Sequence, residues 1–184
     1  MRRELELATT SAQDTRRLAA TVAESLRVGD VVSLTGELGA GKTCFVQGAA
    51  AALGVTERVT SPTFLLRRDY EGRVPIVHLD VYRLDTLQEA SELGLDEVGR
   101  SVTFIEWGDA MQPLLPAGHL EIAFRSLEAD DLEADTADVG GDELRSIVLR
   151  PRGADWKRRI VGLAVDCAPW RQDGGPTHID MLEL

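Results

Sequence analysis

A glycine-rich segment between an apolar run and an alanine-rich run constrains the fold more than any other part of the chain. Residues 36–43 read GELGAGKT and satisfy the pattern G-x-x-x-x-G-K-[ST]. The preceding residues 31–35, VVSLT, are uncharged and mostly β-branched, which is typical of a central strand buried on both faces. Residues 42–53 are alanine-rich and favour a helix that stops at Gly54. Because this pattern forms a phosphate-binding loop when a strand precedes it and a helix follows, the segment predicts an α/β fold.

The chemistry of this loop indicates a nucleotide site. Its glycines let backbone N–H groups turn toward an anionic phosphate, and the N-terminus of the following helix adds partial positive charge. Lys42 is expected to reach the β- and γ-phosphates, and the hydroxyl of Thr43 is expected to ligate Mg²⁺. The expected phosphate-binding residues are Gly36, Glu37, Leu38, Gly39, Ala40, Gly41, Lys42 and Thr43.

Two acidic residues each end a mostly apolar run and are candidates to organise the magnesium ion. Asp80 ends the run VPIVHLD, and Glu106 ends the run VTFIE. Ligands of α/β sheets gather at the carboxyl ends of strands, so a phosphate loop requires at least one such partner. The residues alone leave open which carboxylate is the direct ligand, and either also fits a surface acid at a strand end. His78 alternates with Asp80 and is expected to face the same side, with a structural role favoured over a catalytic one.

The rest of the chain predicts further helices and antiparallel strands. Ser11 and Asp14 predict the N-terminus of an amphipathic helix. This helix is expected to run to Leu26 and to end at Gly29. The other expected elements are a hairpin over 61–84 that turns at Glu71-Gly72, a helical segment over 85–98, a strand over 102–107, an antiparallel pair over 119–124 and 144–150, and a helix over 154–165.

The length of the chain suits one domain with a hydrophobic core. We expect a P-loop domain over residues 1–151 and a C-terminal extension over residues 152–184, made of a helix and a Gly/Pro-rich tail. Much of the acidic charge lies in residues 126–144, which lack aromatic residues and sustained periodicity. This segment is expected to form a solvated loop.

Composition argues against several classes of protein. The formal net charge is −11, so any contact with RNA is expected to run through a basic partner, because nucleic-acid binding rests on neutralising phosphates. No apolar run approaches the ~20 residues that span a bilayer, and no signal-peptide segment is recognisable. Cys44 and Cys167 lie far apart and form no metal-binding spacing, which fits a reducing compartment without structural zinc. We expect a cytoplasmic protein.

The sequence favours ATP over GTP. A GTPase is expected to carry an N-K-x-D motif, and the chain contains no asparagine. Residues 69–72, DYEG, fit the GTPase pattern D-x-x-G but lie where a hairpin turn is expected. A P-loop small-molecule kinase remains the alternative function, although no compact arginine-rich lid is recognisable. A kinase would yield a phosphorylated acceptor, whereas an ATPase yields ADP and phosphate.

Five segments, taken in order, resemble the bacterial TsaE family, also called YjeE. They are GELGAGKT (36–43), SPTF (61–64), HLDVYRL (78–84), ELGLDE (92–97) and IEWGD (105–109), within roughly Leu5 to Arg150. The resemblance implies a P-loop NTPase-like three-layer fold with a mixed, mostly parallel central sheet. It also implies a Mg²⁺-dependent ATPase, slow alone and stimulated by its partners. This ATPase would work with TsaB and TsaD in placing a threonylcarbamoyl group on the adenosine next to the anticodon of certain tRNAs.

The resemblance also implies roles for individual residues. The catalytic set is Lys42, Thr63, Asp80 and Glu106, the metal ligands are Thr43 and Glu106, and the switch and partner-facing set is Ser61, Thr63, Tyr82, Arg83 and Trp107. Thr63, in the switch-like loop 61–64, is a candidate contact for the γ-phosphate or the attacking water. Trp107 follows Glu106 as in the family, although core packing alone would also explain a tryptophan there. The acidic segment before residue 144 and the tail after Pro151 depart from the family pattern, and the resemblance says nothing about either.

Overall fold

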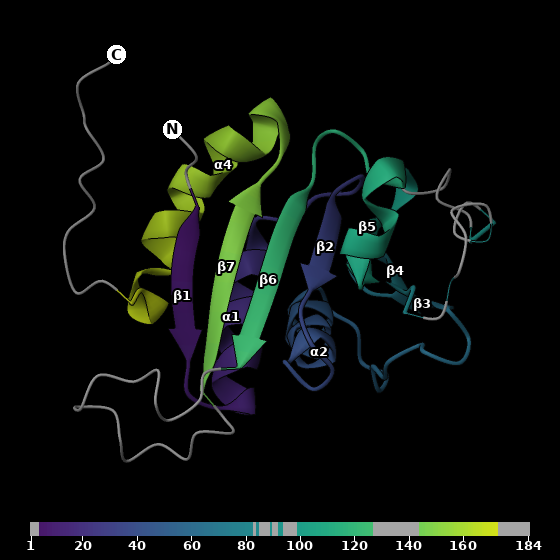
Figure 1. Ribbon diagram of the computed structural model, residues 1–184, viewed down its shortest axis with the longest axis horizontal. Coiled ribbons are helices and arrows are strands. Elements are labelled where there is room, and N and C mark those ends of the chain that lie inside the picture. The colour runs from purple at the N-terminus through teal and green to yellow at the C-terminus, as the bar shows by residue number, and fades with distance from the viewer. Residues whose placement is uncertain are drawn as a thin grey trace.

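The central element of the fold is a seven-stranded sheet (Figure 1). The computed structural model describes residues 4–82, 84, 89, 92–93, 99–126 and 144–172. The strands are β1 (Leu5–Thr9), β2 (Val31–Thr35), β3 (Arg67–Glu71), β4 (Pro75–Asp80), β5 (Val102–Glu106), β6 (Leu120–Ser126) and β7 (Arg145–Pro151). They lie in the order β1-β7-β6-β2-β5-β4-β3. The strand before the glycine-rich loop, β2, is therefore the central one, as the sequence predicts.

The sheet combines parallel and antiparallel pairing. Strand β2 is parallel to both of its neighbours, β5 and β6, and β4 is parallel to β5. The pairs β1-β7, β6-β7 and β3-β4 are antiparallel. The mixed α/β sheet is confirmed, but its parallel part is smaller than expected. Three of the six neighbouring pairs among the described strands are antiparallel, because β3 and β4 form a hairpin and β7 runs antiparallel to both of its neighbours, β6 and β1.

The antiparallel pairs predicted from the sequence are confirmed. In the β3-β4 hairpin Glu71 lies opposite Pro75, so the DYEG segment ends a hairpin strand. Strands β6 and β7 flank residues 127–143, which lie outside the described residues. Most of the helix expected over 85–98 and the tail from residue 173 also lie outside them.

Helix α1 (Ala12–Glu24) begins where the sequence predicts but ends earlier. The Oγ atom of Ser11 accepts a hydrogen bond from the Asp14 backbone N–H at 3.0 Å, which caps the helix. At the other end, the backbone N–H of Ser25 donates to the Val22 carbonyl at 3.1 Å. This tighter bond closes the last turn before Leu26 is reached, and Gly29, with φ +94°, lies in the turn that leads to β2.

Helices lie on both faces of the sheet and make three layers (Figure 1). The helices α1, α2 (Lys42–Ala52) and α4 (Gly153–Asp166) pack into the larger core on one face. The 3-10 helix η2 (Gly108–Leu114) contributes Met111 to a smaller core on the opposite face. A second 3-10 helix, η5 (Ala168–Trp170), follows α4. The predicted three-layer arrangement and the helices after the loop and after Pro151 are therefore confirmed.

The larger core joins the beginning, middle and end of the described chain. Its fully buried side chains include Leu7, Leu18, Phe45, Phe104, Ile147 and Trp156. Among the described residues, no helix has both the length and the apolar character that crossing a bilayer requires. The division between residues 1–151 and 152–184 stays a prediction.

Candidate functional site

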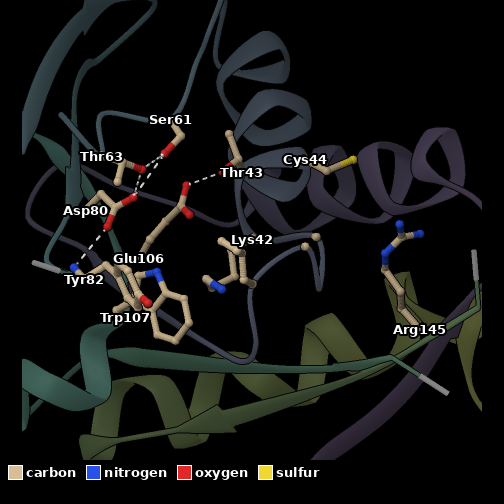
Figure 2. A pocket seen from close by; sticks show the side chains of 13 residues that line it. Lys42, Thr43, Cys44, Ser61, Thr63, Asp80, Tyr82, Glu106, Trp107 and Arg145 are labelled. Carbon is tan, nitrogen blue, oxygen red and sulfur yellow. Dashed lines mark hydrogen bonds between the residues drawn. The ribbon is translucent and has the colours of Figure 1, made fainter. Parts of the chain in front are cut away.

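A cleft of about 370 Å³ lies at the carboxyl ends of β2, β4 and β5 (Figure 2). The three strands are parallel, and their register pairs Asp80 with Glu106 and Glu106 with Leu34. Parallel strands place their carboxyl ends at one edge of a sheet, so the two acidic residues meet there. The lining residues are Leu38, Gly39, Gly41, Lys42, Thr43, Cys44, Ser61, Thr63, Asp80, Tyr82, Glu106, Trp107 and Arg145.

The glycine-rich loop is held close to the sheet by two of its glycines. Gly36 has φ +133°, and a Cβ atom there would lie 2.4 Å from the carbonyl oxygen of Phe124 in β6. Gly41 has φ +111° and begins α2 without any side-chain cap. Both backbone conformations are rarely open to other residues. The uncapped first turn of α2 therefore presents its N–H groups beside the cleft.

Lys42 is buried at the base of the loop. Its Nζ atom donates hydrogen bonds to the carbonyl oxygens of Gly36 and Glu37, each at 2.7 Å. The ammonium group also lies 3.9 Å from the ring centroid of Trp107, within the range of a cation–π contact. Burial lowers the pKa of Lys42, and this outweighs the opposing effect of the nearby carboxylates, of which Glu106 is the strongest.

Glu106 accepts two hydrogen bonds on one carboxylate oxygen. The hydroxyl of Thr43 donates to Oε1 at 2.7 Å, as Figure 2 shows, and Nε2 of His78 lies 2.9 Å from the same atom. Glu106 is 3% exposed and His78 is fully buried. The two residues that the family resemblance links to Mg²⁺, Thr43 and Glu106, are therefore in direct contact.

Asp80 connects the cleft to the loop over residues 61–64. Its Oδ2 atom accepts hydrogen bonds from the hydroxyls of Thr63 at 2.5 Å and Ser61 at 3.1 Å. Its Oδ1 atom accepts one from the backbone N–H of Tyr82 at 3.1 Å. Both oxygens of Asp80 are thus engaged by protein donors. The structure brings Ser61, Thr63 and Asp80 together in one network.

Trp107 lines the cleft and has a left-handed backbone conformation. Its φ of +62° is unusual for a bulky residue and turns the chain from β5 into η2. The ring lies 4.7 Å from that of Tyr82 and faces Lys42, while its other contacts are with the smaller core. Trp107 therefore both packs against the smaller core and lines the cleft. Arg83, the remaining member of the predicted set, lies outside the described residues.

Two lining residues are not among the site residues that the sequence predicts. Cys44 follows the P-loop motif directly, and Arg145 begins β7, more than a hundred residues later. The Cδ and Nε atoms of Arg145 lie 3.0 Å from where a Cβ atom on Gly41 would be. No local motif marks Arg145, because only the pairing of β7 with β6, and of β6 with β2, places it beside the loop.

The donor set fits Mg²⁺ bound together with a nucleotide. Thr43 and Glu106 supply a hydroxyl and a carboxylate oxygen, which are hard ligands of the kind Mg²⁺ prefers. Within the part of the chain that the structure describes, no group of three or more His, Cys, Asp or Glu residues is arranged to hold a metal alone. Mg²⁺ usually takes one or two protein ligands and fills its shell with phosphate oxygens and water, so the set suits this mode of binding.

Comparison with known proteins identifies close relatives over most of the chain. A family model described as "Threonylcarbamoyl adenosine biosynthesis protein TsaE" matches residues 9–134. The chain is 44% identical over 129 residues to "tRNA threonylcarbamoyladenosine biosynthesis protein TsaE" of Treponema pallidum (strain Nichols), covering 69% of this chain and 96% of that protein. It is 39% identical over 153 residues to the protein of the same name from Streptomyces coelicolor, covering 80% and 97%.

A solved structure shows the same fold. The crystal structure of Bacillus subtilis YdiB superposes with a TM-score of 0.71 at 30% sequence identity. The match covers 90% of this chain and 97% of YdiB. The structural match therefore covers a larger share of the chain than the family model, which spans residues 9–134.

Proposed function

The chain belongs to the TsaE family, and from this premise we propose that it is a Mg²⁺-dependent ATPase of tRNA threonylcarbamoyladenosine biosynthesis. In this proposal it works in the cytoplasm with TsaB and TsaD, which form N6-threonylcarbamoyladenosine next to the anticodon. One observation carries the proposal: Lys42, Thr43, Asp80 and Glu106 converge on a single cleft at the carboxyl ends of parallel strands. This is the arrangement that nucleotide-binding α/β sheets use.

The phosphates of ATP would bind to the glycine-rich loop. The N–H groups of residues 36–43 and of the first turn of α2 provide donors for phosphate oxygens. Lys42 would exchange its hydrogen bonds to the Gly36 and Glu37 carbonyls for contacts with the β- and γ-phosphates. Because Lys42 is buried, its charge acts in a medium of low dielectric, where it stabilises negative charge strongly.

Thr43 and Glu106 would hold the magnesium ion, which neutralises charge on the phosphates when bound. Their hydrogen bond at 2.7 Å supports this assignment, because it places the hydroxyl and the carboxylate next to each other in the cleft. Asp80 would orient the attacking water with the help of Thr63, whose hydroxyl donates to it at 2.5 Å. The γ-phosphate would compete with Asp80 for the Thr63 hydroxyl, which links nucleotide binding to the position of loop 61–64.

The rim of the cleft suits a protein partner. Leu38 and Tyr82 line the cleft and are 85% and 56% exposed, and Phe64 and Leu65, which follow the lining residue Thr63 in the chain, are 84% and 63% exposed. Exposed apolar side chains gathered near a site indicate protein contact. The net charge of −11 supports a protein partner over direct binding of tRNA. We assign this rim to TsaB and TsaD, and tRNA contact to the assembled complex.

The experiment that tests the proposal compares ATP turnover of the full chain alone and with purified TsaB and TsaD. We expect slow release of ADP and phosphate from the chain alone and a severalfold increase with both partners. A gel-shift assay of the chain alone should show only weak, non-specific binding to tRNA at physiological salt. Rapid turnover that is indifferent to the partners, or transfer of phosphate to a metabolite, would instead favour a stand-alone ATPase or a small-molecule kinase.

A further inference from the structure

We propose that His78 is a positioning residue that holds the Glu106 carboxylate in the orientation needed to bind Mg²⁺. His78 was expected from the sequence to be structural, and nothing in the proposed function uses it. The inference rests on the proposed function, because it presumes that Glu106 is a magnesium ligand. It adds that the ligand is kept in place by a buried imidazole on the neighbouring strand.

The contact between the two residues is specific. The fully buried ring of His78 in β4 reaches across to Glu106 in β5, with Nε2 2.9 Å from Oε1. Thr43 donates to the same oxygen at 2.7 Å. Among the described residues, no hydrogen bond reaches Oε2. Two donors on Oε1 therefore fix the rotation of the carboxylate and leave Oε2 for another ligand.

The hydrogen-bonding capacity of the ring defines its tautomer. A carboxylate oxygen only accepts, so the hydrogen in the contact belongs to Nε2. The other ring nitrogen, Nδ1, is buried and has no hydrogen-bond partner among the described residues. A ring with its hydrogen on Nε2 leaves a bare acceptor at Nδ1, which costs less than leaving a donor unpaired in the core.

Core packing does not account for this arrangement. The two chain neighbours of His78 in β4, Val77 and Leu79, and its register partner in β5, Phe104, are buried and apolar. A leucine at position 78 would fill the space without an unpartnered nitrogen. The unpartnered nitrogen therefore lowers stability at this position, and the one hydrogen bond of the imidazole among the described residues is with Glu106. We expect His78→Leu to unfold at the same temperature as the parent chain or higher, while its magnesium site weakens.

The test measures Mg²⁺ binding rather than turnover. For each full-length variant, isothermal titration calorimetry determines ADP affinity in EDTA and at increasing concentrations of Mg²⁺. We expect His78→Leu to raise about tenfold the Mg²⁺ concentration at which the effect of Mg²⁺ on ADP affinity is half-maximal, as loss of a hydrogen bond to a metal ligand does. The ADP affinity in EDTA should be unchanged. His78→Gln, whose amide nitrogen can take the place of Nε2, should restore the requirement to within about threefold of the parent.

Two further variants separate positioning from a structural role. Val102→Ala, at the opposite end of β5, should lower thermal stability and leave the Mg²⁺ requirement unchanged. In a Glu106→Gln background, His78→Leu should have no additional effect, because the residue through which His78 acts has been altered.

The outcomes distinguish the two levels of the proposal. A parental Mg²⁺ requirement in His78→Leu, or no rescue by His78→Gln, would overturn the positioning role. An equal rise of the Mg²⁺ requirement in Val102→Ala, or a loss of ADP affinity in EDTA in His78→Leu, would overturn the positioning role as well, because it would show that His78 acts only through stability. Failure of the parent chain itself to bind ADP would instead remove the proposed function, and this inference with it.

Discussion

The two halves of the sheet differ in the groups that donate hydrogen bonds to their carboxylates. The cleft half comprises β2, β3, β4 and β5 with the glycine-rich loop, and the scaffold half comprises β1, β6 and β7 with α4. In the scaffold half, Glu121 is paired with two guanidinium groups, from Arg150 at 2.9 Å and Arg152 at 2.6 Å. In the cleft half, Asp80 and Glu106 are 2% and 3% exposed, and they receive hydroxyl, backbone and imidazole donors instead.

This difference separates charges that support the fold from charges that are available for binding. A guanidinium neutralises a carboxylate and fixes its geometry with parallel hydrogen bonds. Hydroxyl donors leave the negative charge in place, and keeping such charge buried is unfavourable for stability. We infer that the cleft half gives up stability in order to bind a cation and phosphates. The scaffold half, with buried residues such as Trp156 and Leu149, supplies the stability that compensates.

The largest expected effect is on stability in the scaffold half. Trp156 is 2% exposed in the larger core, so Trp156→Ala should lower the free energy of unfolding by about 3–5 kcal/mol. Urea denaturation measures this change. Val165→Ala, at a 69% exposed position of the same helix, is the matched control and should change stability by no more than about 0.5 kcal/mol. The ATP affinity of both variants, measured below the unfolding midpoint, should equal that of the parent chain. A loss of affinity in Trp156→Ala would contradict the inference that the scaffold half supplies stability without taking part in binding.

The next effect is on catalysis in the cleft half. Lys42→Ala should reduce ATP turnover by about 100- to 1000-fold, because in the proposed function the buried ammonium would offset charge on the β- and γ-phosphates. Circular dichroism should remain that of the parent, since Lys42 hydrogen-bonds only carbonyls of its own loop among the described residues. Turnover at the parental rate would exclude Lys42 from the mechanism.

A comparison of the two carboxylates sharpens the description of the cleft. Glu106→Gln should raise the Mg²⁺ requirement about 10- to 100-fold or stop hydrolysis, because an amide binds a hard cation less well than a carboxylate does. Asp80→Asn should impair turnover with a smaller effect on the Mg²⁺ requirement, since both oxygens of Asp80 are engaged by protein donors. The reverse ranking in a Mg²⁺ titration would exchange the two assignments.

The smallest effect is on the acid stability of the scaffold half. Burial alone would raise the pKa of Glu121, but hydrogen bonds from Arg152 and Arg150 outweigh it and lower the pKa below its ordinary value of 4.5. The stabilisation is therefore complete above pH 4.5 and is lost as the pH falls through the lower folded-state pKa.

Glu121→Gln tests this effect. The variant should be less stable than the parent at pH 7, by up to about 1 kcal/mol for a partly exposed pair, and the difference should shrink below pH 4.5. Unfolding curves recorded at several pH values measure it. A constant difference at all pH values would mean that the ion pair contributes nothing through its charge.

The local parts of the molecule were predictable because short stretches of chain encode them. The strand, loop and helix around residues 31–53, the Ser11 cap and the β3-β4 hairpin all follow from neighbouring residues and appear as expected. The residues of the candidate site were also predictable from the sequence, since Lys42 and Thr43 belong to one motif and Asp80 and Glu106 each end an apolar strand. The helix α1 ends before Leu26, where its apolar pattern predicts the end, because the Ser25 hydrogen bonds to the Val22 carbonyl close the last turn earlier.

What the sequence determined by itself is the glycine-rich loop, the identity of its chemical groups and most of the elements that carry them. These depend on backbone preferences and on periodicity over a few residues. Only the tertiary structure decided the order of the strands, and with it the pairing of Asp80 with Glu106, the place of Arg145 beside Gly41 and the contact from His78 to Glu106. Each of these joins segments far apart in the chain. Their proximity results from packing the whole sheet against two cores, which no local pattern records.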